Sequence, residues 1–350
     1  MRYKYICAMV LCVAIAGQGT VLADDTAGEE KAGAEKKQLY EKYEKEYLKS
    51  RKLVRMRELF LGERYKSLES MVQDYRKDYP GDHSKEIYFY QAVIYENGGD
   101  YRKAAETYLE ALRISPDYSR AHNNLANLYC RLHQYHFAET HYRNALDVNP
   151  YNPFINFNLG SLYYDTGSFE KAAEYLDRAI TYKENFAEAY HKRGLVHFRM
   201  QQYSHAIRNF KKAKEFGRES HTTYYYIGMA HYHVEQGSLA IVNLERALQK
   251  KKDFYEAAVA LGDIHKYYGE FKQALQAYGK AIDIKDDSRE VKLKMIQCYN
   301  ELHFYNSAIK MTKELLRDEP DNKELKAMLN RLNTRYLKEN LQEPYDYMSY

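Results

Sequence analysis

Histidine is the residue whose spacing in this sequence first suggests chemistry. His197, His231 and His265 follow one another at one constant interval, so a structure that repeats with that period would place them in a ladder. Neighbouring packed helices lie about 8–10 Å apart, whereas zinc holds its nitrogen ligands at about 2 Å. Two rungs could therefore hardly share one ion. Two interpretations stay open: histidine replaces another ring at a partly buried aromatic position, or the ladder is a pH-responsive array or weak metal site.

Other catalytic patterns are missing from the sequence. Glycine-rich phosphate loops, the serine elbow, the paired histidines of zinc enzymes and paired cysteines do not occur at a usable spacing. Beyond residue 23 only Cys130 and Cys298 remain, which is too few for a disulfide framework. We therefore expect a protein that is not an enzyme and holds no cofactor or metal, although a triad assembled from distant residues leaves no local signal.

The spacing of these histidines recurs through most of the chain. Alanine occupies every position of one ladder with the same period: Ala104, Ala138, Ala172, Ala206, Ala240, Ala274 and Ala308. Four residues later comes a mostly large ladder: Tyr108, Tyr142, Leu176, Phe210, Leu244, Tyr278 and Thr312. A third ladder follows after three more residues: Ala111, Ala145, Ala179, Ala213, Ala247, Ala281 and Leu315. These spacings place all three ladders on one helix face.

A second helix face precedes the first in each unit. Its large residues are Leu125, Leu159, Arg193, Ile227, Leu261 and Met295, and its rings are Tyr95, Tyr129, Tyr163, His197, His231, His265 and Tyr299. Glycine follows the large residue at Gly160, Gly194, Gly228 and Gly262. Because glycine costs up to about 1 kcal/mol inside a helix, we expect the backbone to approach its partner helix closely there. Turn signals such as Gly167-Ser168 and Gly269-Glu270 separate the two faces.

This order of large, small and aromatic positions, and the period at which it recurs, resemble the tetratricopeptide repeat. The resemblance is strongest over residues 119–152, which carry Leu125, Ala126, Tyr129, Tyr135, Ala138, Tyr142, Ala145 and Pro150. The units depart from the family pattern at Gln91 and Arg193, which replace leucine. The terminal proline is also lost at Glu184, Arg218, Lys252 and Asp286.

The resemblance implies an all-α, right-handed solenoid of stacked antiparallel helix pairs. Seven uninterrupted units are predicted at residues 85–118, 119–152, 153–186, 187–220, 221–254, 255–288 and 289–322. A degenerate unit is expected at 49–84, a capping helix at 323–341 and a Tyr-rich tail at 342–350. The charged residues 24–48 are expected to be disordered or weakly helical.

In the family, first-helix residues outside the core ladders line a concave groove that binds peptides. The resemblance therefore implies a peptide-binding groove formed by Asn123, Asn124, Asn127, Arg131, Phe157, Asn158, Tyr164, His191, Lys192, Phe198, Arg199, Tyr225, Tyr226, Met229 and Tyr232. Asparagine can donate and accept at once, as an extended peptide backbone requires. These residues could equally pack within the stack, and both interpretations stay open.

The start of the chain resembles a secretory leader. Arg2 and Lys4 precede an apolar stretch at about 6–16, and Val21-Leu22-Ala23 precedes Asp24-Asp25. The apolar stretch is short for a membrane span, so we expect a signal peptide over residues 1–23 and an exported protein, periplasmic or secreted.

Composition excludes some partners. The net charge is +4 and the basic residues form only short clusters, such as Lys250-Lys251-Lys252, so nucleic acid is not expected as a partner. The 38 tyrosines, with no tryptophan, suit half-buried positions and binding surfaces. We expect a non-catalytic scaffold that binds a protein or peptide partner outside the cytoplasm; the alternative is a carrier of a small apolar ligand. Peripheral membrane association and self-association stay open.

Overall fold

The computed structural model describes residues 26–286 and 288–341. All elements in these ranges are helices, and no strand occurs in them. The predicted all-α stack of helix pairs is thus confirmed. The predicted leader at 1–23 and the Tyr-rich tail at 342–350 lie outside the described residues. Two compact units divide the chain, residues 1–148 and residues 149–350, and each is described by itself.

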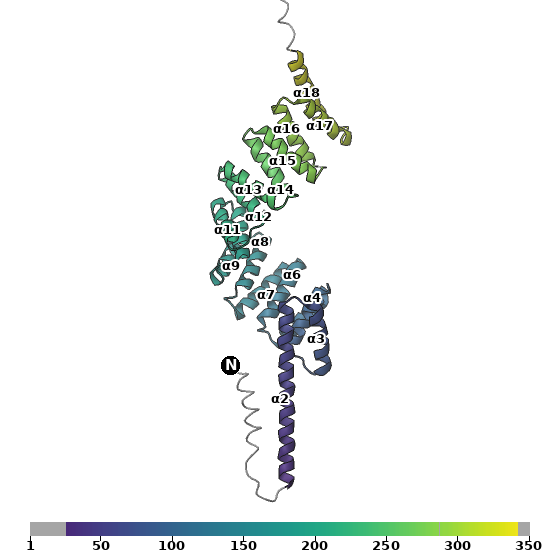
Figure 1. Ribbon diagram of the computed structural model, residues 1–350, viewed down its shortest axis with the longest axis vertical. Coiled ribbons are helices and arrows are strands. Elements are labelled where there is room, and N and C mark those ends of the chain that lie inside the picture. Colours follow the sequence, from purple (N-terminus) through teal and green to yellow (C-terminus); the bar gives the residue numbers. More distant parts are fainter. Residues whose placement is uncertain (1–25, 287, 342–350) are drawn as a thin grey trace, which may run out of the picture. The chain divides into compact units, whose positions relative to one another are not determined.

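The first unit contains the helices α2 to α7. Their bounds are α2 Thr26–Leu61, α3 Tyr65–Asp78, α4 Lys85–Asn97, α5 Tyr101–Ile114, α6 Ser119–Arg131 and α7 Tyr135–Val148. Each helix packs on the next in chain order, and the tightest pairs are α4 with α5 and α6 with α7. Figure 1 shows these helices in purple and blue. The core of this first unit runs from Met56 and Leu59 on α2 through Tyr75 and Tyr108 to Leu125 on α6.

The second unit contains the helices α8 to α18. Their bounds are α8 Pro153–Asp165, α9 Phe169–Tyr182, α10 Ala187–Arg199, α11 Tyr203–Glu215, α12 His221–His233, α13 Gly237–Lys250, α14 Tyr255–Tyr267, α15 Phe271–Ile284, α16 Arg289–Glu301, α17 Tyr305–Asp318 and α18 Lys323–Leu341. The first helices of successive pairs also touch, because α10 contacts both α8 and α12, and α12 contacts α14. From α8 to α14 the first helices are therefore in contact in succession.

The ladders read from the sequence form the interior of the helix pairs. All seven alanines from Ala104 to Ala308 have no exposed surface. The glycine prediction is also confirmed, because a methyl group on Gly160 would lie 2.9 Å from Cγ of Leu176 and one on Gly194 would lie 2.6 Å from Cε1 of Phe210. Glycine at these sites allows the second helix to pack against the first.

One turn geometry recurs after the first helix of each pair. Positive φ angles follow the period of the ladders, at Gly99, His133, Gly167, Gln201, Glu235, Gly269 and His303. The residue after each of these donates its backbone N–H to the carbonyl at the ring position five residues earlier, as Ser168 does to Tyr163 at 2.8 Å. This is the hydrogen bond of a Schellman cap. All seven turns thus share this backbone geometry, although glycine occupies the positive-φ position in only three of them.

The segment at 24–48, predicted to be disordered or weakly helical, lies in a helix from Thr26 onward. Residues from Thr26 to Leu61 form one continuous α2 helix, and the side chains of residues 33–48 are exposed. Residues 34–61 contain no glycine or proline, so nothing in the backbone interrupts helical hydrogen bonding. The C-terminal part of α2 packs against α3, where the apolar residues Leu68, Val72 and Tyr75 are buried.

The capping helix predicted after the last pair is present as α18. It packs on α17, and Leu325 and Leu332 are buried there with Ile296 and Leu315. Apolar contacts at this end thus continue onto α18, the last helix of the described residues.

Candidate functional site

Three aromatic side chains surround Phe198 at the C-terminal end of α10. The ring of Phe198 lies 5.4 Å from Tyr203, 5.4 Å from Tyr226 and 5.9 Å from His233, in each case at a steep angle. Tyr203 and His233 stack face to face at 4.4 Å and 10°. Edge-to-face and stacked geometries are those that aromatic pairs prefer. We call this group, together with Tyr164, Tyr225 and Tyr232, the ring surface.

Packing on the core fixes the base of the ring surface. Tyr226 stacks on the buried ring of Phe210 at 5.7 Å and 17°. Tyr225 packs edge-on against Tyr226 at 5.2 Å and against Phe254 at 5.3 Å. Burial raises the pKa of both tyrosine hydroxyls. These rings are half-buried, so packing holds each of them while part of the side chain stays exposed.

Two cations border the ring surface at Tyr164 on α8. The Lys192 ammonium lies 4.9 Å from the centroid of the Tyr164 ring, and Nε of Arg199 donates to the Tyr164 hydroxyl at 3.4 Å. Lys192 also lies 3.9 Å from Asp165. Because the side chain of Arg199 is exposed and guanidinium suits carboxylates, this border can orient an acidic group of a ligand.

The remaining predicted groove residues of the second unit lie around this centre. Met229 and Tyr232 on α12 are partly buried against the core beneath α12 and α14. Phe157 on α8 contacts Phe186 at 5.1 Å, so its ring is held by the loop before α10. Asn158 is half-buried on the same helix. Phe157 and Asn158 thus lie on α8, the helix of Tyr164, and Met229 lies on α12 with Tyr232.

His191 is the predicted groove residue that the structure does not bring to the surface. Its side chain is 6% exposed and contacts Phe210 at 5.3 Å and Thr223 Oγ1 at 3.3 Å. Burial lowers the pKa of His191 to about 3, and Arg218 and Lys192 lower it further by repulsion. His191 therefore packs between α10, α11 and α12, because its fifth position in the unit points toward the neighbouring helix pair.

The four predicted groove residues on α6 belong to the first unit. Asn127 accepts a hydrogen bond of 2.5 Å from Tyr142, and Asn124 Nδ2 lies 3.5 Å from the Tyr108 hydroxyl. Asn123 donates to Asn124 at 3.3 Å. Arg131 lies over the Tyr101 ring at 5.5 Å and 3.4 Å from Glu96. Much of this polar chemistry is used in contacts within and between the helix pairs.

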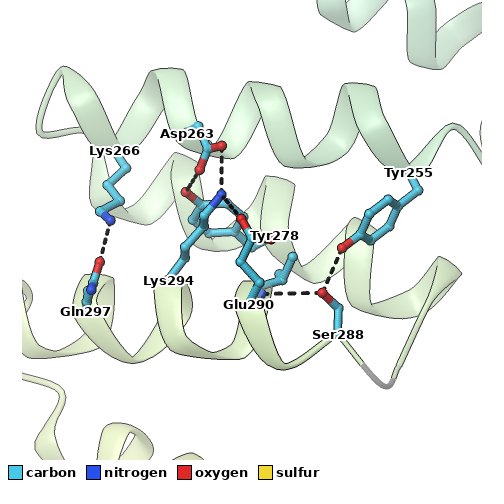
Figure 2. Close-up of polar contacts among 9 residues, drawn as sticks. Tyr255, Asp263, Lys266, Tyr278, Ser288, Glu290, Lys294 and Gln297 are labelled. Atoms are coloured by element: carbon cyan, nitrogen blue, oxygen red, sulfur yellow. Dashed lines mark hydrogen bonds and ion pairs between the residues drawn. The ribbon is translucent and has the colours of Figure 1, made fainter.

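The predicted groove residues end on α12, and a polar cluster lies beyond them on α14, α15 and α16. Figure 2 shows Asp263 accepting from the Tyr278 hydroxyl at 2.6 Å and from Lys294 at 2.9 Å. Lys294 also contacts Glu290 at 2.9 Å, and Lys266 donates to Gln297. Lys294 is thus paired with two carboxylates, whereas Lys266 bonds to a neutral amide. The same first-helix spacing that selected Tyr232 would have found Asp263 and Lys266.

The histidine ladder has a structural explanation. Nδ1 of His197 contacts Gln202 at 2.7 Å, His231 contacts Gln236 at 2.6 Å, and His265 contacts Glu270 at 2.5 Å. Each partner is also the residue whose backbone N–H donates to the carbonyl of the same histidine. Among the described residues no group of three histidine, cysteine or acidic side chains is placed to hold a metal ion. Each histidine thus adds a side-chain hydrogen bond to the backbone hydrogen bond of the Schellman cap.

No helix within the described ranges is long and apolar enough to cross a membrane. Neither of the cysteines among the described residues, Cys130 and Cys298, forms a disulfide. Burial raises the pKa of Cys298, which disfavours the reactive thiolate.

Comparison with protein families and solved structures agrees with this architecture. The tetratricopeptide repeat family matches residues 94–133, 117–185, 187–216 and 267–332, which together make up more than half of the chain. No curated protein matches the sequence.

Two solved bacterial structures share the fold. The C-terminal part of a repeat protein from Cytophaga hutchinsonii is 18% identical, with a TM-score of 0.58 over 69% of this chain and 99% of its own. A tetratricopeptide repeat protein from Parabacteroides merdae is 19% identical, with a TM-score of 0.53 over 72% of this chain and 99% of its own. With its ladders, helix pairs and family matches, the chain belongs to the tetratricopeptide repeat family.

Proposed function

We propose that this protein is a non-catalytic scaffold that binds a peptide segment of a partner protein on the ring surface. One observation carries the proposal: Phe198 lies at the centre of rings supplied by α11 and α12, and Arg199 beside it reaches the Tyr164 hydroxyl on α8. Rigid rings supply contact area with little loss of side-chain freedom. Stacked repeats present such surfaces along a layer of helices.

The chemistry of the ligand follows from the composition of the surface. Half-buried rings favour an apolar, aromatic or proline-rich stretch, since proline-rich segments dock against aromatic side chains. Lys192 and Arg199 at the Tyr164 border favour a carboxylate next to that stretch. The proposed ligand is therefore an extended segment with an acidic group beside apolar side chains.

Site-directed photocrosslinking tests the proposal. A crosslinking residue at position 199 should capture a defined peptide segment in the native compartment, whereas one at exposed Lys272 on α15 should not. The synthetic segment should then bind the purified protein, and Phe198→Ala should weaken binding by roughly tenfold or more. Equal affinity of wild-type protein and Phe198→Ala would refute the ring surface as the binding site.

Export is the second part of the proposal and rests on the leader-like residues 1–23. Cell fractionation with N-terminal sequencing tests it separately. A mature protein outside the cytoplasm that begins near Asp24 supports export. A cytoplasmic protein with an intact start would refute it and leave the ring surface untouched.

A further inference from the structure

Arg193 occupies a position that apolar residues fill in the neighbouring helix pairs. The equivalent residues Leu125, Leu159, Ile227, Leu261 and Met295 are buried. Arginine brings a permanent charge to this interior ladder, and burying a charge is costly unless it is paired. The departure from the repeat therefore calls for an explanation beyond packing.

Neighbouring polar groups hold the Arg193 guanidinium in a fixed position. Its Nε donates to Asn209 Oδ1 at 2.7 Å, and one terminal nitrogen contacts Asp177. The guanidinium carbon lies 5.3 Å above the Tyr190 ring. Asn209 is only 6% exposed, and its Nδ2 donates to the His205 carbonyl at 2.8 Å. The second terminal nitrogen of Arg193 has no hydrogen-bond partner among the described residues.

A cleft of about 690 Å³ opens over this guanidinium between α9, α10 and α11. Basic side chains and imidazoles dominate its lining: Arg193, His197, His205, Arg208, Lys211 and Lys212. His197 and His205 stack at 5.3 Å. Most of the lining residues lie on α11, and none of them belongs to the ring surface, so the cleft is a separate site.

Only part of the positive charge in the cleft is neutralised. Lys212 pairs with Glu215 at 2.9 Å and Arg193 pairs with Asp177. Arg208 and Lys211 make no ion pair with any described residue, although both line the cleft. Two unpaired cations beside an oriented guanidinium provide charge and donors for one compact dianion.

We propose that this cleft is a binding site for a phosphate monoester. Such a group carries a charge of about −1.5 to −2 at neutral pH and three acceptor oxygens. The second terminal nitrogen of Arg193 would donate to one oxygen, while Arg208 and Lys211 would contact the others. The imidazoles of His197 and His205 would pack against the group that carries the phosphate. This proposal does not depend on the ring surface.

Titration of the full chain with three probes tests the site and identifies the source of the phosphate. Inorganic phosphate and glycerol 3-phosphate represent soluble ligands, and vesicles of phosphatidylcholine with and without phosphatidic acid represent a lipid headgroup. Amide chemical shifts of α10 and α11 should change saturably with a soluble phosphate, or sedimentation should show binding to phosphatidic acid vesicles only. Either pattern supports the site and names its source.

The variant Arg208→Ala/Lys211→Ala should weaken that binding roughly tenfold or more. Both side chains are exposed, so the fold should not change. The matched control Lys272→Ala/Lys280→Ala removes two exposed cations from α15 and should bind as the wild type does. Equal binding by both variants, or no saturable response to any probe, would overturn the proposal.

The variant Arg193→Leu tests whether Arg193 contacts the phosphate or only pairs with its neighbours in the protein. It restores the residue type of the ladder but leaves the buried Asn209 Oδ1 without its donor, so the melting temperature should not rise, whereas phosphate binding should fall roughly tenfold. A change in melting temperature with unchanged binding would assign Arg193 to structure alone and refute its contact with the ligand.

Discussion

A methyl group built on Gly262 would lie 2.4 Å from Cε1 of Tyr278, whose side chain has no exposed surface. The missing side chain on α14 is thus what allows the tyrosine of α15 to pack against the helix backbone. Gly194 and Phe210 show the same relationship at 2.6 Å in another helix pair.

Gly262→Ala is therefore expected to destabilise the protein. The Tyr278 ring is fully buried and must shift to admit the methyl group, and overpacking of this kind costs about 1–3 kcal/mol. The gain in helix propensity, about 1 kcal/mol, offsets part of this cost. Urea denaturation should show a lower midpoint.

Gly279 on α15 provides the matched control. A methyl group there meets nothing within 4 Å, so Gly279→Ala should stabilise the protein by up to about 1 kcal/mol through helix propensity alone. If the two substitutions shift the denaturation midpoint in the same direction, close packing at Gly262 does not control stability.

These glycines also show how far the sequence predicts the fold. The ladders around Ala104 and Gly262 repeat at a fixed spacing, so they identified the helix pairs, the close approaches and the capping helix. These features depend on contacts that recur in every unit, so the same residue types recur at the same spacing in the sequence. The continuous α2 helix was missed because its exposed side chains show no apolar periodicity from which to predict it.

The functional surfaces were predictable only in part. First-helix spacing selected Phe198 and Tyr226 correctly as neighbours in space. It also selected His191, because spacing alone does not show that the ring turns toward Phe210. Tyr203 and the cleft at Arg193 were missed, since both join first and second helices. Only the replacement of leucine by Arg193 in the ladder signalled the cleft.

Asp263→Ala is expected to destabilise the protein by about 1–3 kcal/mol. The substitution leaves the Tyr278 hydroxyl and one contact of Lys294 without an acceptor (Figure 2). Burial is the largest cause of the raised pKa of Tyr278, and the bond to Asp263 adds to it. Asp263→Asn keeps an acceptor for Tyr278 and should cost less.

A double-mutant cycle with Tyr278→Phe checks this assignment by chemical denaturation. In the Tyr278→Phe background, which lacks the hydroxyl, Asp263→Ala should lower the free energy of unfolding much less than it does in the wild type. If Asp263→Asn costs as much as Asp263→Ala, the charge of Asp263 matters more than its hydrogen bond to Tyr278.

Acidification is expected to destabilise the second unit through His191. The folded pKa of His191 is about 3 because the ring is buried, whereas an unfolded histidine titrates near 6.5. Between these values the unfolded chain binds more protons, so stability is fully present above about pH 6.5 and falls as the pH decreases. At pH 5 the loss from His191 is about 2 kcal/mol.

Denaturation between pH 7.5 and pH 5 measures this slope. His191→Gln removes the titrating group and should give a shallower loss of stability with acid. His136→Gln, at an exposed histidine on α7, is the control and should keep the wild-type slope. An unchanged slope in His191→Gln would show that other groups dominate the acid response.

At the ring surface, the contribution of Arg199 to peptide affinity is expected to depend on salt concentration, whereas that of the aromatic rings is not. Arg199 is exposed beside the Tyr164 hydroxyl, so its attraction for an acidic group is screened as ionic strength rises. Arg199→Ala should therefore weaken binding of the crosslinked segment at low salt and have much less effect near 1 M, where the Debye length is about 3 Å.

Phe198→Ala removes apolar contact with Tyr203, Tyr226 and His233, and this loss does not depend on screening of charges. It should weaken binding by a similar factor at low and high salt, with the change mainly in the dissociation rate. Binding rates measured across a salt series check both variants. If Phe198→Ala lost its effect at high salt as Arg199→Ala does, the rings would act only by positioning the cations, and the proposed division between apolar contact and charge would be wrong.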